Sequence, residues 1–372
     1  MDHLAKATRI AGYKLGEVLG QGGFGITYKA RHLKTGELAA IKEFFPADYA
    51  TRDGASVIAS PKHRKLFDFG LKAFLEEAFI LRDLPQVAGL VQVRAAFEKH
   101  GTAYCVMDYI KGDPLERMVP RLVQRNGHVP ENLVRTVIHA MCHALDAVHD
   151  AGLIHRDIKP ANIMIRVDEQ PVLIDFGAAR PLGRTTALAS MFTRKYAALE
   201  QFPPELLGEE KLPLREGPAS DLFALSVMLY ELVSQSLPTP ANDRYIALRD
   251  TGRDPYIPVS ENLRRNRIEA TYSPDLLRLI DLGCALLPRD RPATARDYET
   301  ELLRAGKGGA PNRHARPAPG PRRAAPAPRP QGRKRANGRK ANDTGLSGPR
   351  LMLLIMFALA FVTILYGYMT RY

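Results

Sequence analysis

Two short segments of this sequence carry side chains that suit phosphoryl transfer. Residues 155–164 read HRDIKPANIM, and a DFG triplet that begins at Asp175 follows eleven positions later. Asp157 can accept a proton from a hydroxyl, and Lys159 can neutralise a moving phosphoryl group. Oxygen atoms of Asn162 and Asp175 can hold magnesium. Because phosphoryl transfer needs positioned charge and metal rather than covalent chemistry from the protein, this order and spacing predict such a site.

A glycine-rich segment precedes these residues. Gly20, Gly22 and Gly25 would let backbone amides approach phosphates without a Cβ in the way. The same GxGxxG spacing occurs in dinucleotide-binding folds and in ordinary hairpins, but a dinucleotide fold requires a helix directly after the glycines. Residues 26–30, ITYKA, are strand-like instead, so we expect a strand, a turn and a second strand.

Lys42 ends an apolar run and is a candidate contact for the α- and β-phosphates. Its carboxylate partner is expected on the next helix, at residues 74–81, where FLEEAFIL has helical periodicity. Glu76 and Glu77 compete for this role. Glu77 borders the apolar stripe and is preferred, and Glu76 is the alternative. The long segment before this helix is interpreted as an insertion that forms a small ordered flap of unassigned role.

Together with AIK at residues 40–42 and ALE at residues 198–200, these motifs resemble those of the eukaryotic-type (Hanks-type) Ser/Thr protein kinases of bacteria. The resemblance implies an α+β, two-lobed protein-kinase fold over residues 13–304. The N-lobe, small and β-rich, is expected at about 13–108, and the larger helical C-lobe at about 109–304. Residues 1–12 are expected to form an N-terminal extension.

The resemblance also implies roles for the residues that match the family motifs. Asp157 would be the catalytic base for transfer to a protein Ser or Thr hydroxyl, and Lys159 would contact the γ-phosphate of ATP. Asn162 and Asp175 would carry Mg²⁺. Lys42 would pair with Glu77, as the arrangement that aligns ATP. All the charged catalytic groups are retained, which disfavours a pseudokinase.

The adenine of ATP is expected at the linker between the lobes. Met107 resembles the gatekeeper, and Asp108 to Ile110 resemble the hinge. Ala40 and Thr27 are also expected at the nucleotide. Thr27 stands where family members often carry Val, so the affinity for nucleotide can differ.

Two further expectations from the resemblance are structural. Asp221 would brace the catalytic loop, and Arg291 would pair with Glu200. Arg156 precedes the catalytic Asp, which in the family often marks regulation by a phosphate on the activation loop. Candidate hydroxyls in that loop are Thr185, Thr186, Ser190 and Thr193, of which Thr185 and Thr186 are preferred as autophosphorylation sites and Thr193 as a residue beside the base.

The net charge of +13 is concentrated in the C-terminal part of the chain. Residues 305–350 are rich in Pro, Ala and Arg, and they hold twelve Lys or Arg residues against one acid, Asp343. Such a segment cannot bury a core, so we expect a disordered basic linker. Because no aromatic residue interleaves the basic ones, specific nucleic-acid binding is not expected.

Residues 351–370 contain no charged side chain. As a helix they would span about 30 Å, the thickness of a bilayer's hydrocarbon core. We therefore expect a C-terminal transmembrane helix. Since the basic residues precede it, the positive-inside rule predicts a single-pass protein of the cell membrane with its kinase domain in the cytoplasm. The linker would lie along anionic headgroups.

The remaining composition predicts a reducing compartment. Cys105, Cys142 and Cys284 are few and widely spaced, which argues against disulfides and zinc sites. No N-terminal signal peptide is expected. His139 and His143 have the helical spacing of two zinc ligands, but Ala140 stands where a zincin would have Glu, so Mg²⁺ with ATP is the only metal predicted.

Three functions are consistent with these patterns. The first is an active membrane-tethered Ser/Thr protein kinase that acts on protein substrates and autophosphorylates its activation loop. The second is a pseudokinase-like scaffold or binding module, and the third is a small-molecule kinase of similar fold. The ALE segment disfavours the third. Whether the chain forms a homodimer for autophosphorylation in trans stays open.

Overall fold

The computed structural model describes residues 3–176, 180–181, 194–209, 214–270 and 272–305. The fold described below belongs to one compact unit, Met1–Pro311. The predicted linker after residue 305 and the predicted span at 351–370 lie outside the described residues. Among the helices that the structure describes, none is long and apolar enough to cross a membrane.

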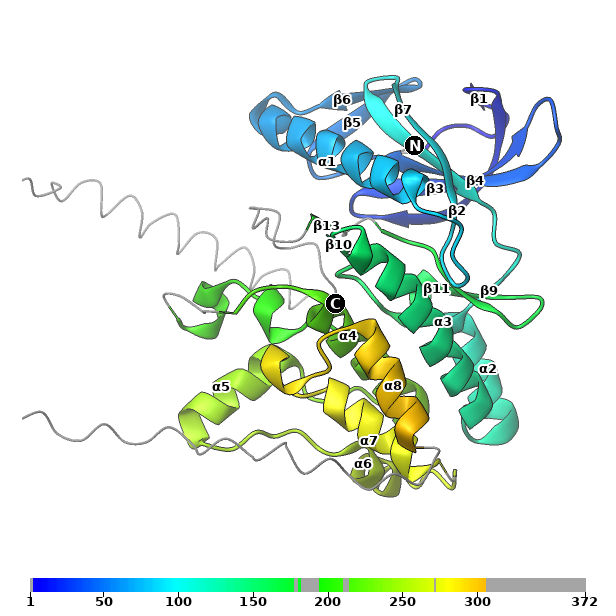
Figure 1. Ribbon diagram of the computed structural model, residues 1–372. Coiled ribbons are helices and arrows are strands. Elements are labelled where there is room, and N and C mark those ends of the chain that lie inside the picture. The colour runs from blue at the N-terminus through cyan, green and yellow to red at the C-terminus, as the bar shows by residue number, and fades with distance from the viewer. Residues whose placement is uncertain (1–2, 177–179, 182–193, 210–213, 271, 306–372) are drawn as a thin grey trace, which may run out of the picture. The chain divides into compact units, whose positions relative to one another are not determined.

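The N-lobe is a six-stranded antiparallel sheet with the long helix α1 packed against it (Figure 1). The strand order is β1-β2-β3-β4-β8-β7. These elements are β1 (Arg9–Ile10), β2 (Tyr13–Gly22), β3 (Gly25–His32), β4 (Leu38–Phe44), α1 (Arg64–Asp83), β7 (Val93–Lys99) and β8 (Thr102–Asp108). The alternating apolar residues of β3 lie in the core, because successive side chains of a strand point to opposite faces, whereas β4 is buried at most of its positions.

Two further segments also join this lobe. The N-terminal extension is anchored by the buried side chain of Leu4 and by β1, which pairs with β2. The expected insertion forms the hairpin β5 (Ala50–Asp53) and β6 (Ser56–Ala59), followed by the short 3₁₀ helix η1 (Pro61–His63). Its apolar residues join the same core as the sheet.

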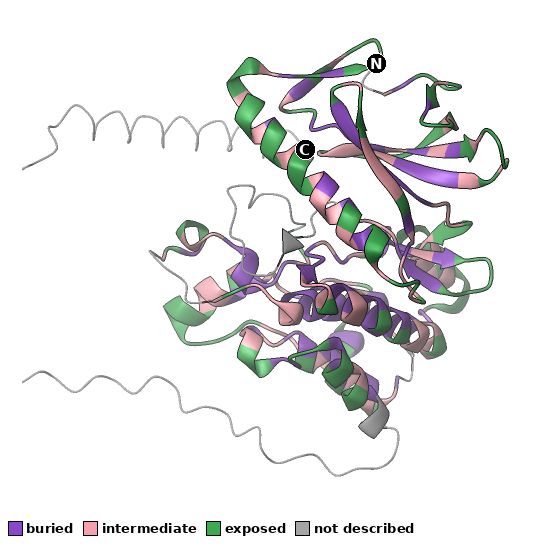
Figure 2. Ribbon diagram, turned by 45° about the horizontal axis from the view of Figure 1, so that its top comes forward, coloured by how far each residue is buried: buried purple, intermediate pink, exposed green. Residues whose placement is uncertain are grey.

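Helix α1 includes the expected helix at residues 74–81 and begins earlier, at Arg64. Its buried residues face the sheet, whereas its outer side is exposed (Figure 2). Phe67 and Phe74 both contact the ring of Phe44, with ring centroids 5.4 and 5.8 Å apart. The aromatic contacts therefore fix α1 against the strand that carries Lys42.

The C-lobe is mainly helical. Its helices are α2 (Leu115–Asn126), α3 (Glu131–Asp150), α4 (Pro218–Ser234), α5 (Ala241–Thr251), α6 (Val259–Arg265), α7 (Pro274–Gly283) and α8 (Ala295–Ala305). Its short strands are β9 (Gly112–Pro114), β10 (Leu153–Ile154), β11 (Ile163–Arg166), β12 (Pro171–Leu173) and β13 (Arg180–Pro181). The 3₁₀ helices are η2 (Pro160–Asn162), η3 (Leu199–Gln201), η4 (Pro204–Leu207) and η5 (Pro288–Asp290). Helix α4 is apolar almost all round and lies at the centre of this lobe, as its composition requires.

A buried ion pair joins distant parts of the C-lobe. The guanidinium of Arg291 donates to the carboxylate of Glu200 at 2.7 and 3.2 Å, and both side chains are fully buried. The hydroxyl of Ser220 donates to the same carboxylate at 2.7 Å. The structure therefore confirms the predicted pairing of Arg291 with Glu200.

Candidate active site

The segment from β10 to η2 carries the residues predicted for catalysis. Asp221 accepts hydrogen bonds from the backbone of this loop. The backbone N–H groups of His155 and Arg156 donate to the Asp221 carboxylate, both at 2.8 Å. The ring nitrogen Nε2 of His149 lies 2.8 Å from the same carboxylate. Burial alone would raise the pKa of Asp221, but these hydrogen bonds and the nearby imidazoles hold it below its ordinary value. An ionised carboxylate therefore fixes the backbone of this loop.

Three predicted catalytic side chains meet within the loop. Nζ of Lys159 lies 2.7 Å from Oδ2 of Asp157. Nδ2 of Asn162 donates to the same Oδ2 at 3.0 Å and to the Asp157 carbonyl at 2.7 Å. Because both neighbours hold one oxygen, the carboxylate has a defined orientation. A hydroxyl brought to it would meet an acceptor with a positive charge beside it.

Asp175 lies next to this loop and contacts the N-lobe. Lys42 donates a hydrogen bond from Nζ to Oδ1 of Asp175. The backbone N–H of Ile174 donates to the Asn162 carbonyl at 3.0 Å, so Asn162 and Asp175 belong to adjacent stretches of chain. A carboxylate oxygen and an amide oxygen at such positions are the hard ligands that Mg²⁺ prefers, so the residues present fit this ion.

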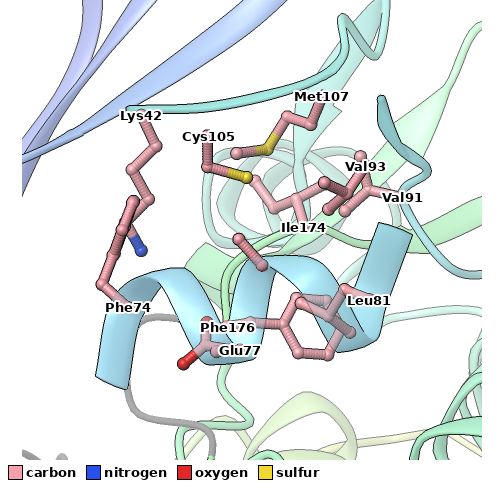
Figure 3. Close-up of a pocket in the computed structure, with 11 residues that line it drawn as sticks. Lys42, Phe74, Glu77, Leu81, Val91, Val93, Cys105, Met107, Ile174 and Phe176 are labelled. Atoms are coloured by element: carbon pink, nitrogen blue, oxygen red, sulfur yellow. The ribbon is translucent and has the colours of Figure 1, made fainter. Parts of the chain in front are cut away.

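A pocket lies beneath Lys42, between β4, α1 and the strands β7 and β8 (Figure 3). It is lined by Lys42, Phe74, Glu77, Ala78, Leu81, Val91, Val93, Cys105, Met107, Ile174 and Phe176. Glu76 instead forms a 3.9 Å ion pair with Lys72, on the more exposed side of the helix. The structure thus places Glu77, and not the alternative Glu76, in the pocket with Lys42.

The charge of Lys42 is stabilised by its neighbours. Burial lowers the pKa of this ammonium, but the carboxylates of Asp175 and Glu77 more than offset that effect and hold the pKa above its ordinary value. Lys42 is therefore a permanent cation at physiological pH, which suits contact with phosphates.

The glycine-rich segment covers the end of β2, the turn and the start of β3, so a strand and no helix follows the glycines. A Cβ at Gly25 would lie 2.5 Å from the Glu43 carbonyl oxygen, so close packing of the strands requires glycine there. At Gly20 and Gly22 a Cβ would meet no atom within 4 Å, so the protein's own packing does not require glycine. Thr27 pairs in register with Lys42 on the neighbouring strand.

The residues predicted around adenine gather at the end of β8. Met107 lines the pocket and pairs in register with Ala40 on β4. Asp108 ends the strand; its side chain is paired with Arg94 at 2.6 Å, and its backbone N–H donates to the Gln92 carbonyl. Ile110 is partly buried against the C-lobe core. The hinge predicted at Asp108 to Ile110 thus follows directly on the pocket strand.

Sequence reasoning missed two residues that position the catalytic loop. His149 contacts Asp221 from the last turn of α3, and local periodicity gave no signal for that role. Glu216 pairs with Arg156 through two hydrogen bonds of 2.5 and 2.9 Å, although sixty positions separate them. Arg156 is buried. The candidate phosphorylation sites Thr185, Thr186, Ser190 and Thr193 lie outside the described residues.

Comparison with known proteins gives a consistent assignment. The model of the protein kinase domain matches residues 13–302. Serine/threonine-protein kinase PknB of Mycolicibacterium smegmatis is 28% identical over 302 residues, which cover 81% of this chain and 44% of that protein. Serine/threonine-protein kinase PknA of Nostoc sp. is 28% identical over 298 residues, which cover 79% and 47%.

A solved structure is similar over the same region. The structure titled "PpkA-294 apo form" matches with a TM-score of 0.67 and 30% identity, over 81% of this chain and 100% of that one. The chain spans about half the length of the curated relatives that it matches. The match over residues 13–302, together with the observed two-lobed fold, shows that this chain belongs to the protein kinase family.

Proposed function

We propose that this chain is an ATP-dependent Ser/Thr protein kinase that transfers the γ-phosphate of ATP to protein hydroxyls. The observation that carries the proposal is the arrangement at Asp157. Its carboxylate is flanked by the Lys159 ammonium and the Asn162 amide. Asp175 lies on the adjacent segment and accepts a hydrogen bond from Lys42. The names of the bacterial relatives support Ser and Thr as acceptors.

In this proposal each side chain has one task. Asp157 orients the acceptor hydroxyl and takes its proton, while Lys159 neutralises charge on the phosphoryl group. Lys42 contacts the α- and β-phosphates and is oriented by Glu77. Asn162 and Asp175 would hold Mg²⁺, which when bound would offset the charge of the phosphates.

The proposal includes a place in the cell. The uncharged residues 351–370 would cross the cell membrane once, and the basic residues before them would keep the kinase domain on the cytoplasmic face. Support comes from the sequence alone. Carbonate extraction of membranes tests it, because a spanning chain stays in the membrane pellet, whereas a chain lacking residues 351–372 should become extractable.

The central experiment compares the full-length chain with its Asp157→Asn variant. With labelled ATP, Mg²⁺ and a generic protein substrate, loss of the base should lower the transfer rate by about 10²–10⁴-fold. Asp168→Asn is the matched control, because this exposed aspartate forms an ion pair with Arg166 of its own turn and should leave transfer unchanged. Equal rates for Asp157→Asn and the unmodified chain would contradict the proposal.

The same assay distinguishes an active kinase from the pseudokinase-like scaffold. An unmodified chain that binds ATP and transfers no phosphate would favour a pseudokinase-like binding module. Autophosphorylation in trans, which a homodimer would permit, is tested by mixing the active chain with a tagged Asp157→Asn chain. We expect label on the tagged chain, at Thr185 or Thr186 by mass spectrometry.

A further inference from the structure

Helix α3 carries a row of polar side chains along the edge where it packs against α8. Arg296 of α8 forms ion pairs with Asp146 and Asp150 of α3, at 2.7 and 2.9 Å. One turn further along α8, Glu299 contacts the two histidines of α3 that the sequence placed four residues apart. The interface between α3 and α8 therefore has two parts. Arg296 forms ion pairs in one part, and the other consists of two imidazoles and a carboxylate.

The geometry of the second half is that of a ligand cluster. Nδ1 of His139 lies 2.5 Å from Oε1 of Glu299, and Nε2 of His143 lies 3.7 Å from the same oxygen. The imidazole centroids are 4.4 Å apart, and one ligand atom from each residue lies within 4.8 Å of the others. Four-residue spacing on a helix puts both rings on one face, and the neighbouring helix supplies the third group.

We propose that His139, His143 and Glu299 bind a divalent first-row transition metal ion, with zinc as the reference case. Two imidazoles and one carboxylate are ligands that suit Zn²⁺, and water would complete a tetrahedral shell. Metal–ligand bonds of about 2.0–2.2 Å place neighbouring ligand atoms about 3.4 Å apart. The 2.5 Å contact would lengthen and the 3.7 Å contact would shorten, which requires only side-chain rotation.

Two features of the site favour a cation. His139 and His143 are exposed, so an ion can enter from solvent without any movement of the backbone. The local charge is negative, since Glu299, Asp146 and Asp150 outnumber the nearby Arg296. The metal would tie α8 to α3, in the same way as the ion pairs of Arg296 do one turn away.

The sequence argument against zinc no longer applies to this cluster. That argument rested on Ala140, which stands where a zincin carries its general base. A site that only fastens two helices needs no general base, and the carboxylate ligand comes from 160 positions away. The proposed site is independent of the proposed phosphoryl transfer, because none of its three residues lines the pocket at Lys42.

Metal binding is tested on the full-length chain without nucleotide or Mg²⁺. Titration with Zn²⁺, and with Co²⁺ read by its visible absorption, should show one site. Zn²⁺ should also raise the thermal unfolding temperature, because a ligand that binds only the folded state stabilises it. His139→Ala/His143→Ala should abolish the site, and Glu299→Gln should weaken it by at least about tenfold, the loss that even an indirect ligand contact causes.

The matched control is His32→Ala, an N-lobe histidine that contacts Tyr13 and Thr35 and should leave the Co²⁺ spectrum unchanged. Equal Zn²⁺ affinity in the unmodified chain and the double histidine variant would overturn the proposal. Unchanged affinity in Glu299→Gln would also overturn the three-ligand site, since the metal would then be held by the histidine pair alone. Because the variants are compared by unfolding before metal is added, a folding defect is seen separately.

Discussion

Lys42 and Glu43 are neighbours on β4, yet their charges serve two different regions of the N-lobe. Successive residues of a strand point to opposite faces, so Lys42 faces the pocket and Glu43 faces the core on the other side. Lys42 pairs with Asp175, which lies 133 positions away and is partly exposed. Glu43 is fully buried.

The partners of Glu43 come from three parts of the N-lobe. The hydroxyls of Tyr28 and Tyr104 donate to its carboxylate at 2.8 and 2.7 Å. Arg52, from the inserted hairpin, donates at 2.6 and 3.2 Å. Tyr28 in turn accepts a hydrogen bond from the backbone of Leu4 at 3.0 Å. The network therefore ties the N-terminal extension and the insertion to the strand that carries Lys42.

One strand therefore carries a residue of the proposed active site, Lys42, and a residue that stabilises the fold, Glu43. A buried charge with a complete set of hydrogen-bond partners fixes structure, because any rearrangement would leave a charge unpaired. Lys42, in contrast, is held by carboxylates on segments that also belong to the proposed site. Variants at the two positions should therefore separate stability from activity.

The largest effect is expected from Glu43→Gln. The substitution breaks the buried ion pair between Glu43 and Arg52, which should cost about 3–5 kcal/mol of unfolding free energy, measured by denaturant titration. The double variant Glu43→Gln/Arg52→Met removes both charges and should recover most of the loss. A Glu43→Gln protein as stable as the unmodified one would contradict the role of this network.

Lys42→Met should affect activity instead. Loss of one positioned cation at the phosphates should lower kcat/KM by about 10²–10³-fold. The unfolding free energy should change less than in Glu43→Gln, because the Asp175 carboxylate is partly exposed and can be hydrated. If Lys42→Met were less stable than Glu43→Gln, the assignment of activity to Lys42 and of stability to Glu43 would be wrong.

Tyr28 and Tyr104 should contribute unequally to the stability of the Glu43 network. Each loses a hydrogen bond to a charged group on replacement by Phe, at a cost of about 1.5–3 kcal/mol. Tyr28→Phe should cost more than Tyr104→Phe, because it also removes the acceptor for the Leu4 N–H. Hydrogen exchange should show faster exchange at the Leu4 amide in Tyr28→Phe, with no such change in Tyr104→Phe.

The pH dependence of the Lys42 ion pairs should be small. The pKa of Lys42 is raised in the folded protein, so the stability from its pairing is fully present below the ordinary value of 10.5. It is lost only as the pH rises through the higher folded value. The difference in unfolding free energy between the unmodified chain and Lys42→Met should therefore be constant from about pH 6 to 9. A steep change in that range would indicate a pKa that is lowered instead.

The smallest effect is expected at Cys105, which lines the same pocket. Burial raises the pKa of its thiol to about 12, so almost no thiolate forms at pH 8. Iodoacetamide should therefore leave Cys105 unmodified in the folded chain and should label it after unfolding, as peptide mass mapping would show. Rapid labelling of the folded chain would mean that the pocket is more open to solvent than its burial indicates.

The sequence motifs were sufficient to predict the two-lobed fold and the position of the catalytic loop. The catalytic residues of HRDIKPAN lie within a few positions of one another, so their closeness in the sequence also places them close together in space. The glycine turn, the strand ending at Lys42 and the helix around Glu77 were predictable for the same reason, because local periodicity sets which face each side chain occupies. The choice of Glu77 over Glu76 also followed from that periodicity, and the pocket geometry agrees with it.

The contacts between distant residues depend on how separate elements pack, and the sequence did not reveal them. Arg156 with Glu216, Glu43 with Arg52, and the histidines of α3 with Glu299 are brought together by packing of separate elements. No periodic pattern marks such pairs, since hydrogen bonds depend on side-chain positions within a few tenths of an ångström. The insertion shows this most clearly: its sequence predicted a flap without a role, and its folded position makes it the source of the charge that balances Glu43.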